Sequence, residues 1–329
     1  MGRKTNSQFW KDKRVLITGH EGFLGSWLTK TLQEYGARVV GIDKAKERLL
    51  SVIKGSRRKI KGIKGDIANA ALVNKIINRD KPQFIFHIAA EAIVNRANKN
   101  PLRTFKSNIQ GTWNILEAAK GKDFIEGIVV ASSDKAYGSH KKLPYKEEAA
   151  LKGEHPYDVS KSCTDLLCRS YFVTFNVPVC VTRCGNIYGP GDFNFSRLIP
   201  DAIRHILRHK QFVIRSDGKF TRDYIFVKDI VEAYLVLAEN IAKRKLAGEA
   251  FNFSNEKPLS VLDAFNKIAQ SCNGSRAIKP KILNRAQHEI QHQYLSSRKA
   301  KDLLGWKAGY SFERGLKETV SWYQANLKA

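Results

Sequence analysis

The first half of the chain alternates short apolar runs with longer segments in which apolar residues recur at helical spacing. The apolar runs predict strands over residues 14–18, 38–42, 60–65, 83–88, 127–133 and 177–183. The segments between them predict helices over residues 23–35, 69–78, 101–119 and 156–175. Strands that alternate with helices are typical of a parallel sheet covered on both faces. We therefore predict the α/β class, with a Rossmann-like doubly wound parallel sheet.

The alternation stops after Arg183. Residues 186–194 are rich in Gly, Pro and Asn and predict a loop. A further strand is predicted over residues 224–227, and helices over 197–209, 229–240, 259–271 and 312–324. We expect two parts: a sheet domain of residues 1–184 with about 224–254, and a smaller C-terminal lobe of about 185–223 and 255–329.

Composition narrows the class of protein. No stretch approaches the roughly 20 apolar residues of a membrane span, and the polar, basic residues 1–13 do not resemble a secretory leader. The five cysteines are odd in number and form no C-x-x-C pair, which argues against a disulfide framework and a structural zinc site. We expect a cytoplasmic protein without a metal.

The net charge of +26 is unusual. Such a charge could indicate nucleic-acid binding, and Lys54, Arg57, Arg58, Lys59, Lys61 and Lys64 form a basic run. That run contains no interleaved aromatic residues on which bases would stack. We expect a lysine-rich solvated surface without a nucleic-acid partner, and a positive field would also attract a diphosphate substrate.

A glycine-rich turn, TGHEGFLG at 18–25, joins the first predicted strand to the first helix. Glycines at this place allow a tight turn and a close approach of the backbone to a pyrophosphate, which the helix N-terminus binds. The predicted cofactor-binding residues here are Gly19, Gly22, Phe23, Leu24 and Gly25.

Three further strand ends belong to the same predicted site. Asp43 ends the second strand, where a carboxylate can bind the adenosine ribose hydroxyls and favours NAD over NADP. Asp66 and Ile67 follow the third strand, where the adenine is expected, and the small Ala89 and Ala90 follow the fourth. We therefore predict NAD as the cofactor.

A catalytic group is predicted at the end of the fifth strand. Tyr157 and Lys161 are spaced i, i+4 and so lie on one helix face. The pKa of a tyrosine is ordinarily near 10, and a nearby ammonium would lower it. Ser133 can bind a substrate hydroxyl and relay its proton to Tyr157. Together they form a hydride-transfer site with an internal acid/base.

From residue 15 to about 323 the chain resembles the extended short-chain dehydrogenase/reductases, the NAD-dependent epimerase/dehydratase family, that act on nucleotide-sugars. The resemblance lies in TGHEGFLGSWL at 18–28, HIAA at 87–90, NIQGTWNILEAA at 108–119, SSDKAYG at 132–138, YDVSK at 157–161, RCGNIYGPGD at 183–192, RDYIFVKDIVEAY at 222–234 and LGW at 304–306. It implies that the sheet domain binds NAD and the lobe binds a nucleotide-sugar.

The pair Asp134 and Lys135 resembles the CDP-glucose 4,6-dehydratases more than the epimerases of the family. The resemblance implies that Tyr157 and Ser133 oxidise C4 with NAD, that Lys135 removes the C5 proton and that Asp134 protonates the leaving C6 hydroxyl. If the pair only neutralises itself, a 4-epimerase is the alternative. A third alternative is a non-enzymatic RNA-binding or sensor protein on this scaffold, which typically lacks the Tyr/Lys pair.

Family resemblance also suggests the groups that bind substrate and partner. Asn186 and Arg222 are candidates for the diphosphate, Arg215 for the nucleotide, and Arg197 for either, since guanidinium matches phosphate geometry. The helices over 101–119 and 156–175 resemble the pair that forms a homodimer interface in this family. The apolar residues of the second helix are Leu166, Leu167, Phe172 and Phe175. The alternative is that they only cover the sheet.

Overall fold

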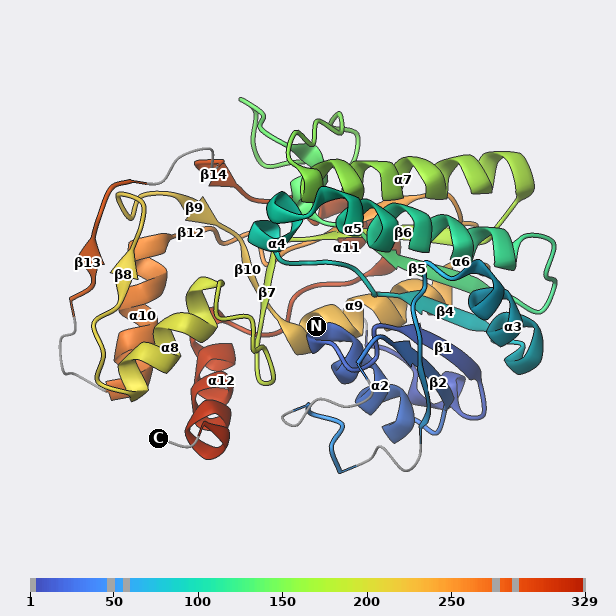
Figure 1. Ribbon diagram of the computed structural model, residues 1–329, viewed down its shortest axis with the longest axis horizontal. Helices are drawn as coiled ribbons and strands as arrows, with labels where there is room; N and C mark the ends of the chain where they lie inside the picture. Colours follow the sequence, from blue (N-terminus) through green and yellow to red (C-terminus); the bar gives the residue numbers. More distant parts are fainter. Residues whose placement is uncertain (1–3, 46–50, 56–59, 274–278, 286–289, 328–329) are drawn as a thin grey trace.

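A computed structural model describes residues 4–45, 51–55, 60–273, 279–285 and 290–327 (Figure 1). Its centre is a seven-stranded sheet in which every pairing is parallel. Across the sheet the strands are β11 (Ala250–Phe253), β6 (Val179–Cys184), β5 (Gly127–Ala131), β4 (Phe84–His87), β1 (Arg14–Thr18), β2 (Arg38–Asp43) and β3 (Lys61–Lys64). The predicted fold class and all six predicted strands of the first half are confirmed.

Helices cover both faces of this sheet because its strands are apolar on both sides. In β1, Val15 and Ile17 contribute to one core and Leu16 to the other. The first core is completed by α2 (Phe23–Glu34) and α9 (Val227–Asn240), and the second by α3 (Ala70–Asp80), α6 (Gly111–Ala119) and α7 (Pro156–Phe175). Burying one such aliphatic side chain stabilises the fold by about 1.5–3 kcal/mol.

Local sequence sets the ends of these helices. The Asn69 side chain accepts a hydrogen bond from Leu72 N at the start of α3, as expected of an N-cap. Pro156 is the first residue of α7, and Asn176 ends that helix in the left-handed conformation with φ 56°. The long helix that carries Tyr157 and Lys161 therefore begins directly before this pair.

The helix predicted over residues 101–119 is interrupted in the structure. It consists of α5 (Pro101–Phe105), a π-helical segment η2 (Lys106–Gln110) and α6. Such segments are frequent at functional sites. Four shorter helices among the described residues also lie in this part of the molecule: α1 (Ser7–Trp10), α4 (Val94–Lys99), the 3₁₀ helix η3 (Asp134–Tyr137) and α11 (Arg298–Leu304), which contacts β11 and α9.

The remaining elements form a smaller lobe beside the sheet, on the left of Figure 1. Its helices are α8 (Leu198–Leu207), α10 (Val261–Asn273) and α12 (Phe312–Asn326). One small sheet contains β12 (Leu259–Ser260), β9 (Thr221–Arg222) and β14 (His292–Gln293), and a second contains β13 (Lys281–Ile282) and β8 (Val213–Ile214). Within the described residues, no helix is long and apolar enough to cross a membrane.

Two expectations for the second half need correction. The predicted loop over residues 186–194 begins as a strand, β7 (Asn186–Tyr188), which pairs in parallel with β10 (Tyr224–Phe226). The strand expected over 224–227 is thus present, but outside the main sheet. The seventh strand of the main sheet is β11, which the sequence analysis missed because four residues, AFNF, carry little periodicity.

Candidate active site

The glycine-rich turn joins β1 to α2 as predicted. Gly19 has a φ of +75°, and a Cβ on it would lie 2.9 Å from the backbone of Ala89. A Cβ on Gly25 would lie 2.0 Å from the Gly19 carbonyl oxygen. Gly22 caps α2 without a side-chain hydrogen bond. The backbone is therefore bare at a helix N-terminus, which fits the pyrophosphate of NAD. Phe23 and Leu24 form the first turn of α2.

Asp43 lies beside this turn at the end of β2. Its carboxylate accepts hydrogen bonds from Glu21 N at 3.1 Å and from Ala45 N at 2.9 Å. Lys44, which would otherwise favour a 2′-phosphate, forms an ion pair with Asp66 at 3.1 Å. Because Asp66 partly neutralises Lys44, the lysine is less available to bind a 2′-phosphate. The preference for NAD predicted from Asp43 is therefore retained.

Ile67 and the two alanines also occupy the predicted edge. Ile67 is buried, and its carbonyl accepts a hydrogen bond from the Asn114 side chain at 2.9 Å. Ala89 N donates to Thr18 Oγ1 at 3.1 Å directly after β4, and Ala90 follows it. The residues predicted to bind the cofactor between Gly19 and Ala90 thus lie at or shortly after the carboxyl ends of β1, β2, β3 and β4. Tyr157 and Lys161, predicted for the same role, lie on α7.

Ser133, Tyr157 and Lys161 come together beyond the end of β5. Tyr157 hydrogen-bonds the Ser133 side chain, and Lys161 Nζ lies 5.9 Å from the centroid of the Tyr157 ring. Burial raises the pKa of Tyr157 to about 12, whereas the Ser133 hydrogen bond and the charge of Arg197 oppose this rise. The three side chains are thus close to one another, and their acid/base role stays a prediction. Lowering of the Tyr157 pKa by Lys161 stays a prediction.

Lys161 is held in a buried polar setting. Its Nζ donates to the Ala131 carbonyl oxygen at 2.6 Å. Burial lowers the pKa of Lys161 to about 8, and the charge of Asp165 opposes this shift. Because Ala131 is the last residue of β5, the hydrogen bond ties α7 to the strand end at which the catalytic segment begins.

Asp134 and Lys135 follow Ser133 in the 3₁₀ helix η3. Asp134 is buried, and Ser133 Oγ donates to its Oδ1 at 3.0 Å. Burial raises the pKa of Asp134 above its ordinary value, although Lys135, Ser133 and Arg222 act in the opposite direction. Lys135 Nζ donates to Gln293 Oε1 at 3.0 Å. A carboxyl with a raised pKa and an amine therefore directly follow Ser133 in the chain.

The predicted substrate-binding residues differ in how they relate to Ser133, Asp134 and Tyr157. Arg197 precedes α8, pairs with Asp192 at 3.1 Å and affects the Tyr157 pKa. Arg222 on β9 donates to the Thr221 and Gln291 carbonyls and affects Asp134. Asn186 is half-buried in β7 beside β10.

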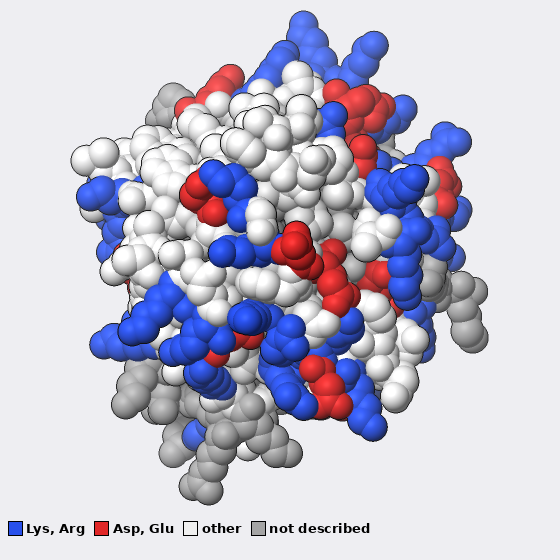
Figure 2. Space-filling view, turned by 90° about the vertical axis from the view of Figure 1, so that its right-hand side faces the viewer, with Lys and Arg blue, Asp and Glu red and all other residues white. Residues whose placement is uncertain are grey.

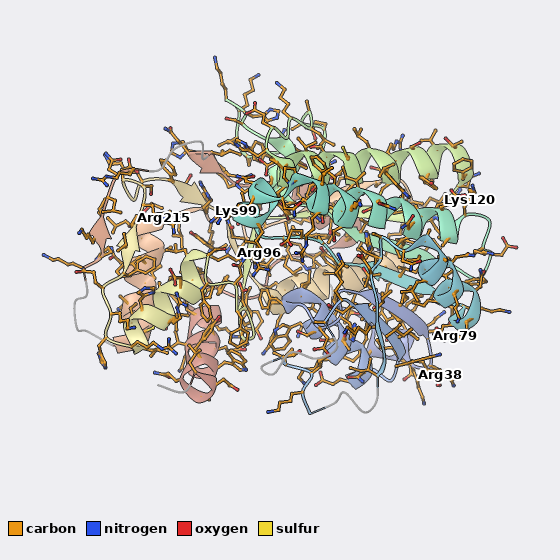
Figure 3. The ribbon with its side chains drawn as sticks, in the orientation of Figure 1. Arg38, Arg79, Arg96, Lys99, Lys120 and Arg215 are labelled. Carbon is orange, nitrogen blue, oxygen red and sulfur yellow. The ribbon has the colours of Figure 1, made fainter. Side chains whose placement is uncertain are left out.

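Arg215 is the outlier of this set. It is exposed and follows β8, on the lobe (Figure 3). Its carbonyl accepts a hydrogen bond from Arg285 N at 2.7 Å. The structure thus brings Arg197 and Arg222 into electrostatic range of Tyr157 and Asp134, which are predicted to be catalytic, whereas no contact joins Arg215 to them among the described residues.

The sequence model of the family described as "NAD dependent epimerase/dehydratase family" matches residues 15–253. The chain belongs to this family. The predicted family and the NAD cofactor are thereby confirmed.

Two curated relatives carry dehydratase names. The CDP-glucose 4,6-dehydratase of Salmonella typhimurium is 30% identical, over 98% of this chain and 94% of that protein. A trifunctional Arabidopsis thaliana protein, whose name includes UDP-glucose 4,6-dehydratase, is 31% identical over 95% of this chain, which spans only 47% of that relative.

The fold is also shared with an epimerase. The solved structure of UDP-glucose 4-epimerase from Thermotoga maritima, with UDP-glucose, has a TM-score of 0.86 and 26% identity, and the match covers 96% of this chain and 100% of that one. Both activities expected for the chain therefore occur among its relatives.

Positive charge on this family member is distributed over the surface together with acidic residues. Figure 2 shows Lys and Arg interspersed with Asp and Glu on the face that forms the right-hand side of Figure 1. Labelled side chains on that side are Arg38, Arg79 and Lys120 (Figure 3). Their acidic partners are Asp12, Asp80 and Glu117. In the basic run, Lys61 pairs with Asp80, and residues 57–59 lie outside the described part.

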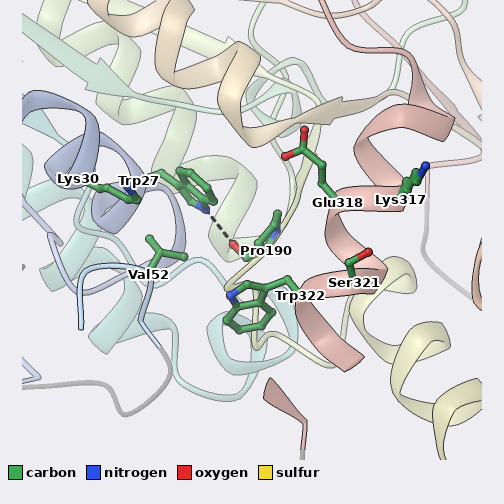
Figure 4. Close-up of a pocket in the computed structure, with 8 residues that line it drawn as sticks. All are labelled: Trp27, Lys30, Val52, Pro190, Lys317, Glu318, Ser321 and Trp322. Atoms are coloured by element: carbon green, nitrogen blue, oxygen red, sulfur yellow. Dashed lines mark hydrogen bonds between the residues drawn. The ribbon is translucent and has the colours of Figure 1, made fainter. Parts of the chain in front are cut away.

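A pocket of about 560 Å³ lies apart from the catalytic group, between α2 and α12 (Figure 4). Its lining residues are Trp27, Lys30, Val52, Pro190, Lys317, Glu318, Ser321 and Trp322. Trp27 Nε1 donates to the Pro190 carbonyl oxygen at 2.8 Å. Because none of the predicted site residues lines it, this pocket does not belong to the proposed chemistry.

The sequence analysis missed two polar residues beside the site. Asn108 in the π-helical segment is buried, and its amide donates to Ser160 Oγ on α7 at 2.9 Å and to the Glu91 carbonyl oxygen at 3.2 Å. A polar residue on the buried side of an apolar helix could have revealed it. Gln293 gave no such signal, because its strand contains only two residues.

Proposed function

We propose that this protein is an NAD-dependent 4,6-dehydratase that converts a nucleoside-diphosphate hexose, of the CDP-glucose type, into its 4-keto-6-deoxy product. One observation carries the proposal: Asp134 and Lys135 directly follow Ser133 at the end of β5 and have different hydrogen-bond partners. Oxidation at C4 needs only the Ser133, Tyr157 and Lys161 group. An adjacent acid and amine are the two further groups that elimination of water requires.

In the first half of the proposed reaction, Tyr157 removes the proton of the C4 hydroxyl, and Ser133 orients that hydroxyl. When bound, NAD would supply the hydride chemistry, accepting the C4 hydride that is later delivered to C6. Backbone at Gly19, Gly22 and Gly25 holds the pyrophosphate and Asp43 the adenosine ribose. Asp66, Ile67, Ala89 and Ala90 line the rest of the cofactor site, and Lys161 holds the nicotinamide ribose.

In the second half, the 4-keto group acidifies the C5 proton, and Lys135 removes it. The C6–O bond breaks as Asp134 donates its proton to the leaving hydroxyl, which departs as water. Burial keeps the pKa of Asp134 above its ordinary value and so favours the protonated form that this role needs. Lys135 later returns its proton to C5.

The nucleotide-sugar is proposed to bind between the NAD-binding domain, residues 1–184 with about 224–254, and the lobe of about 185–223 and 255–329. Arg197 and Arg222, which act electrostatically on Tyr157 and Asp134, are proposed to bind the diphosphate together with Asn186. Arg215 is proposed for the nucleotide, at the outer end of the lobe.

A 4-epimerase is the second candidate, since the fold is shared with a solved epimerase. In that reaction Asp134 and Lys135 would only neutralise each other. Their side chains hydrogen-bond to Ser133 and Gln293 rather than to each other, and the charge of Lys135 acts on Asp134 without a hydrogen bond between the two side chains in the described part of the chain. This difference in partners favours the dehydratase.

The direct test is incubation of the purified protein with CDP-, UDP-, dTDP- and GDP-hexoses, followed by mass spectrometry of the products. A dehydratase gives a product one water lighter than its substrate, with a keto absorbance in alkali. A C4 epimer of unchanged mass, with no keto product, would overturn the dehydratase in favour of the epimerase. Salt-dependent RNA binding with no turnover would point to the non-enzymatic alternative.

We also propose a homodimer formed through α5, α6 and α7. These neighbouring helices expose the apolar side chains Leu102, Trp113, Leu166, Val173 and Phe175. By contrast, Leu167 and Phe172 are partly buried against the sheet core. An exposed apolar face of this kind is typical of a protein–protein interface.

Leu166, at 62% exposed, tests this interface. We expect Leu166→Glu to give a monomer in light scattering at micromolar concentration, because it places a charge in an apolar contact. The matched control is Leu303→Glu, at an exposed position on α11, which should leave the dimer intact. A monomeric wild-type protein would contradict the proposed assembly.

A cytoplasmic location is proposed on the state of the cysteines. Cys163, Cys168, Cys180, Cys184 and Cys272 are all free thiols. Reducing compartments maintain thiols in this state, so localisation of a tagged protein in living cells is the corresponding test.

A further inference from the structure

Gln293 is buried beside the proposed elimination residues although it lies 158 positions from Lys135 in the chain. Its Oε1 accepts a hydrogen bond from Lys135 Nζ at 3.0 Å. Its Nε2 has no hydrogen-bond partner among the described residues. Burying an amide whose Nε2 is unpaired costs free energy. The hydrogen bond to Lys135 is the one side-chain hydrogen bond that Gln293 makes among the described residues.

The lobe places Gln293 at this point. Strand β14 runs parallel to β9, with Gln293 opposite Arg222 in the register. Arg222 acts electrostatically on Asp134, and Lys135 acts on both Asp134 and Asp158. One small sheet of the lobe therefore presents two side chains to Asp134 and Lys135.

We propose that Gln293 is a positioning residue: it orients Lys135 Nζ by one hydrogen bond and, being an uncharged amide, stabilises the ammonium form less than a carboxylate would. The inference rests on the proposed dehydratase function. A neutral amine donates one N–H to Oε1 and keeps its lone pair for the C5 proton. The C5–H electron pair then forms the C5=C6 bond as the C6–O bond breaks, and the proton from Asp134 completes the water.

A carboxylate at the same place would act differently, because a negative partner favours the protonated amine. Lys135 acts electrostatically on Asp134 in its own segment and on Asp158 of α7. These two carboxyls are also affected by Arg222 on β9 and by His155 and Glu154 just before α7. Gln293→Glu would add a third carboxylate to the buried Asp134 and Asp158. Elimination should then require a higher pH.

The experiment uses the NAD-loaded protein and the hexose nucleotide that it dehydrates, and follows reduced cofactor and water loss separately in a single turnover. We expect Gln293→Glu to move the pH profile of water loss upward by about one unit or more while C4 oxidation persists. Gln293→Met, which keeps the shape without the acceptor, should slow water loss by about tenfold or more at every pH. Gln211→Glu, the same change at an exposed position, should alter neither.

The outcomes separate this inference from the function on which it rests. A variant that still oxidises C4 is folded. Recovery of water loss by Gln293→Glu at high pH would show the same. If either folded variant eliminates water with the wild-type rate and pH profile, Gln293 has no positioning role, although the dehydratase stands. If the wild-type protein itself releases no water from any hexose nucleotide, the proposed function is wrong.

Discussion

The NAD half and the sugar half of the candidate site are assembled differently. On the NAD side, Gly19 directly follows β1, Asp43 ends β2 and Ala89 lies two residues after β4, and their contacts link neighbouring elements of one sheet. On the sugar side, Lys135 is held by Gln293 from the lobe, and Asp134 is influenced by Arg222. The first half is encoded by short contiguous motifs. The second half exists only when the lobe is packed against the sheet.

This difference predicts that variants of the two halves change different measurements. The largest effect is expected for Tyr157→Phe, which removes the group proposed to take the proton of the C4 hydroxyl. C4 oxidation should fall by about 10²- to 10⁴-fold, with NAD affinity unchanged by calorimetry. Tyr171→Phe, on the same helix with its hydroxyl bonded to Glu117, is the matched control. Oxidation at the wild-type rate in Tyr157→Phe would show that Tyr157 is not the base for C4 oxidation.

A smaller effect, confined to the NAD side, is expected for Gly25→Ala. The new Cβ would lie 2.0 Å from the Gly19 carbonyl oxygen, so the turn must open. NAD affinity should fall by about tenfold or more, equivalent to at least about 1.4 kcal/mol. At Gly55 a Cβ meets nothing within 4 Å, so Gly55→Ala should bind NAD normally. Equal affinities for the two variants would show that the turn does not contact the cofactor.

The smallest effect concerns stability, through His87 in the middle of the sheet. His87 hydrogen-bonds Thr18 and Thr112, and burial lowers its pKa to about 3, with Lys161 acting in the same direction. As pH falls below about 6.5, the unfolded chain takes up a proton that the folded chain refuses. The stability contributed by neutral His87 is complete above pH 6.5 and is lost toward pH 3, at up to about 1.4 kcal/mol per pH unit.

Urea unfolding between pH 7 and 5 measures this slope. His87→Gln should make the free energy of unfolding less dependent on pH, because glutamine does not titrate. His209→Asn, at an exposed position with φ 53°, should keep the wild-type slope. An unchanged slope in His87→Gln would mean that the pKa of His87 is the same in the folded and the unfolded protein.

The sequence predicted the NAD side more completely than the sugar side for a physical reason. Glycine and aspartate at strand ends have conformational and hydrogen-bonding requirements that can be recognised locally. The main sheet follows from apolar runs such as 84–87, buried on both faces. Strand β11 was missed because its place beside β6 depends on long-range pairing.

The interruption of the helix at 106–110 and the partner of Lys135 were missed for the same kind of reason. Asn108 bonds to α7, and Gln293 reaches Lys135 across 158 positions. Neither contact leaves a period or a spacing in the sequence. Asp134 and Lys135 themselves were found only because they resemble a motif, and their surroundings required the structure.

The most direct test of the central claim is a single turnover of Lys135→Ala loaded with NAD, compared with the wild-type protein on the same hexose nucleotide. We expect reduced cofactor to form and persist, showing C4 oxidation, while the product one water lighter falls by about 10²-fold or more. Formation of the 4-keto-6-deoxy product at the wild-type rate would contradict the account, because elimination would then proceed without Lys135.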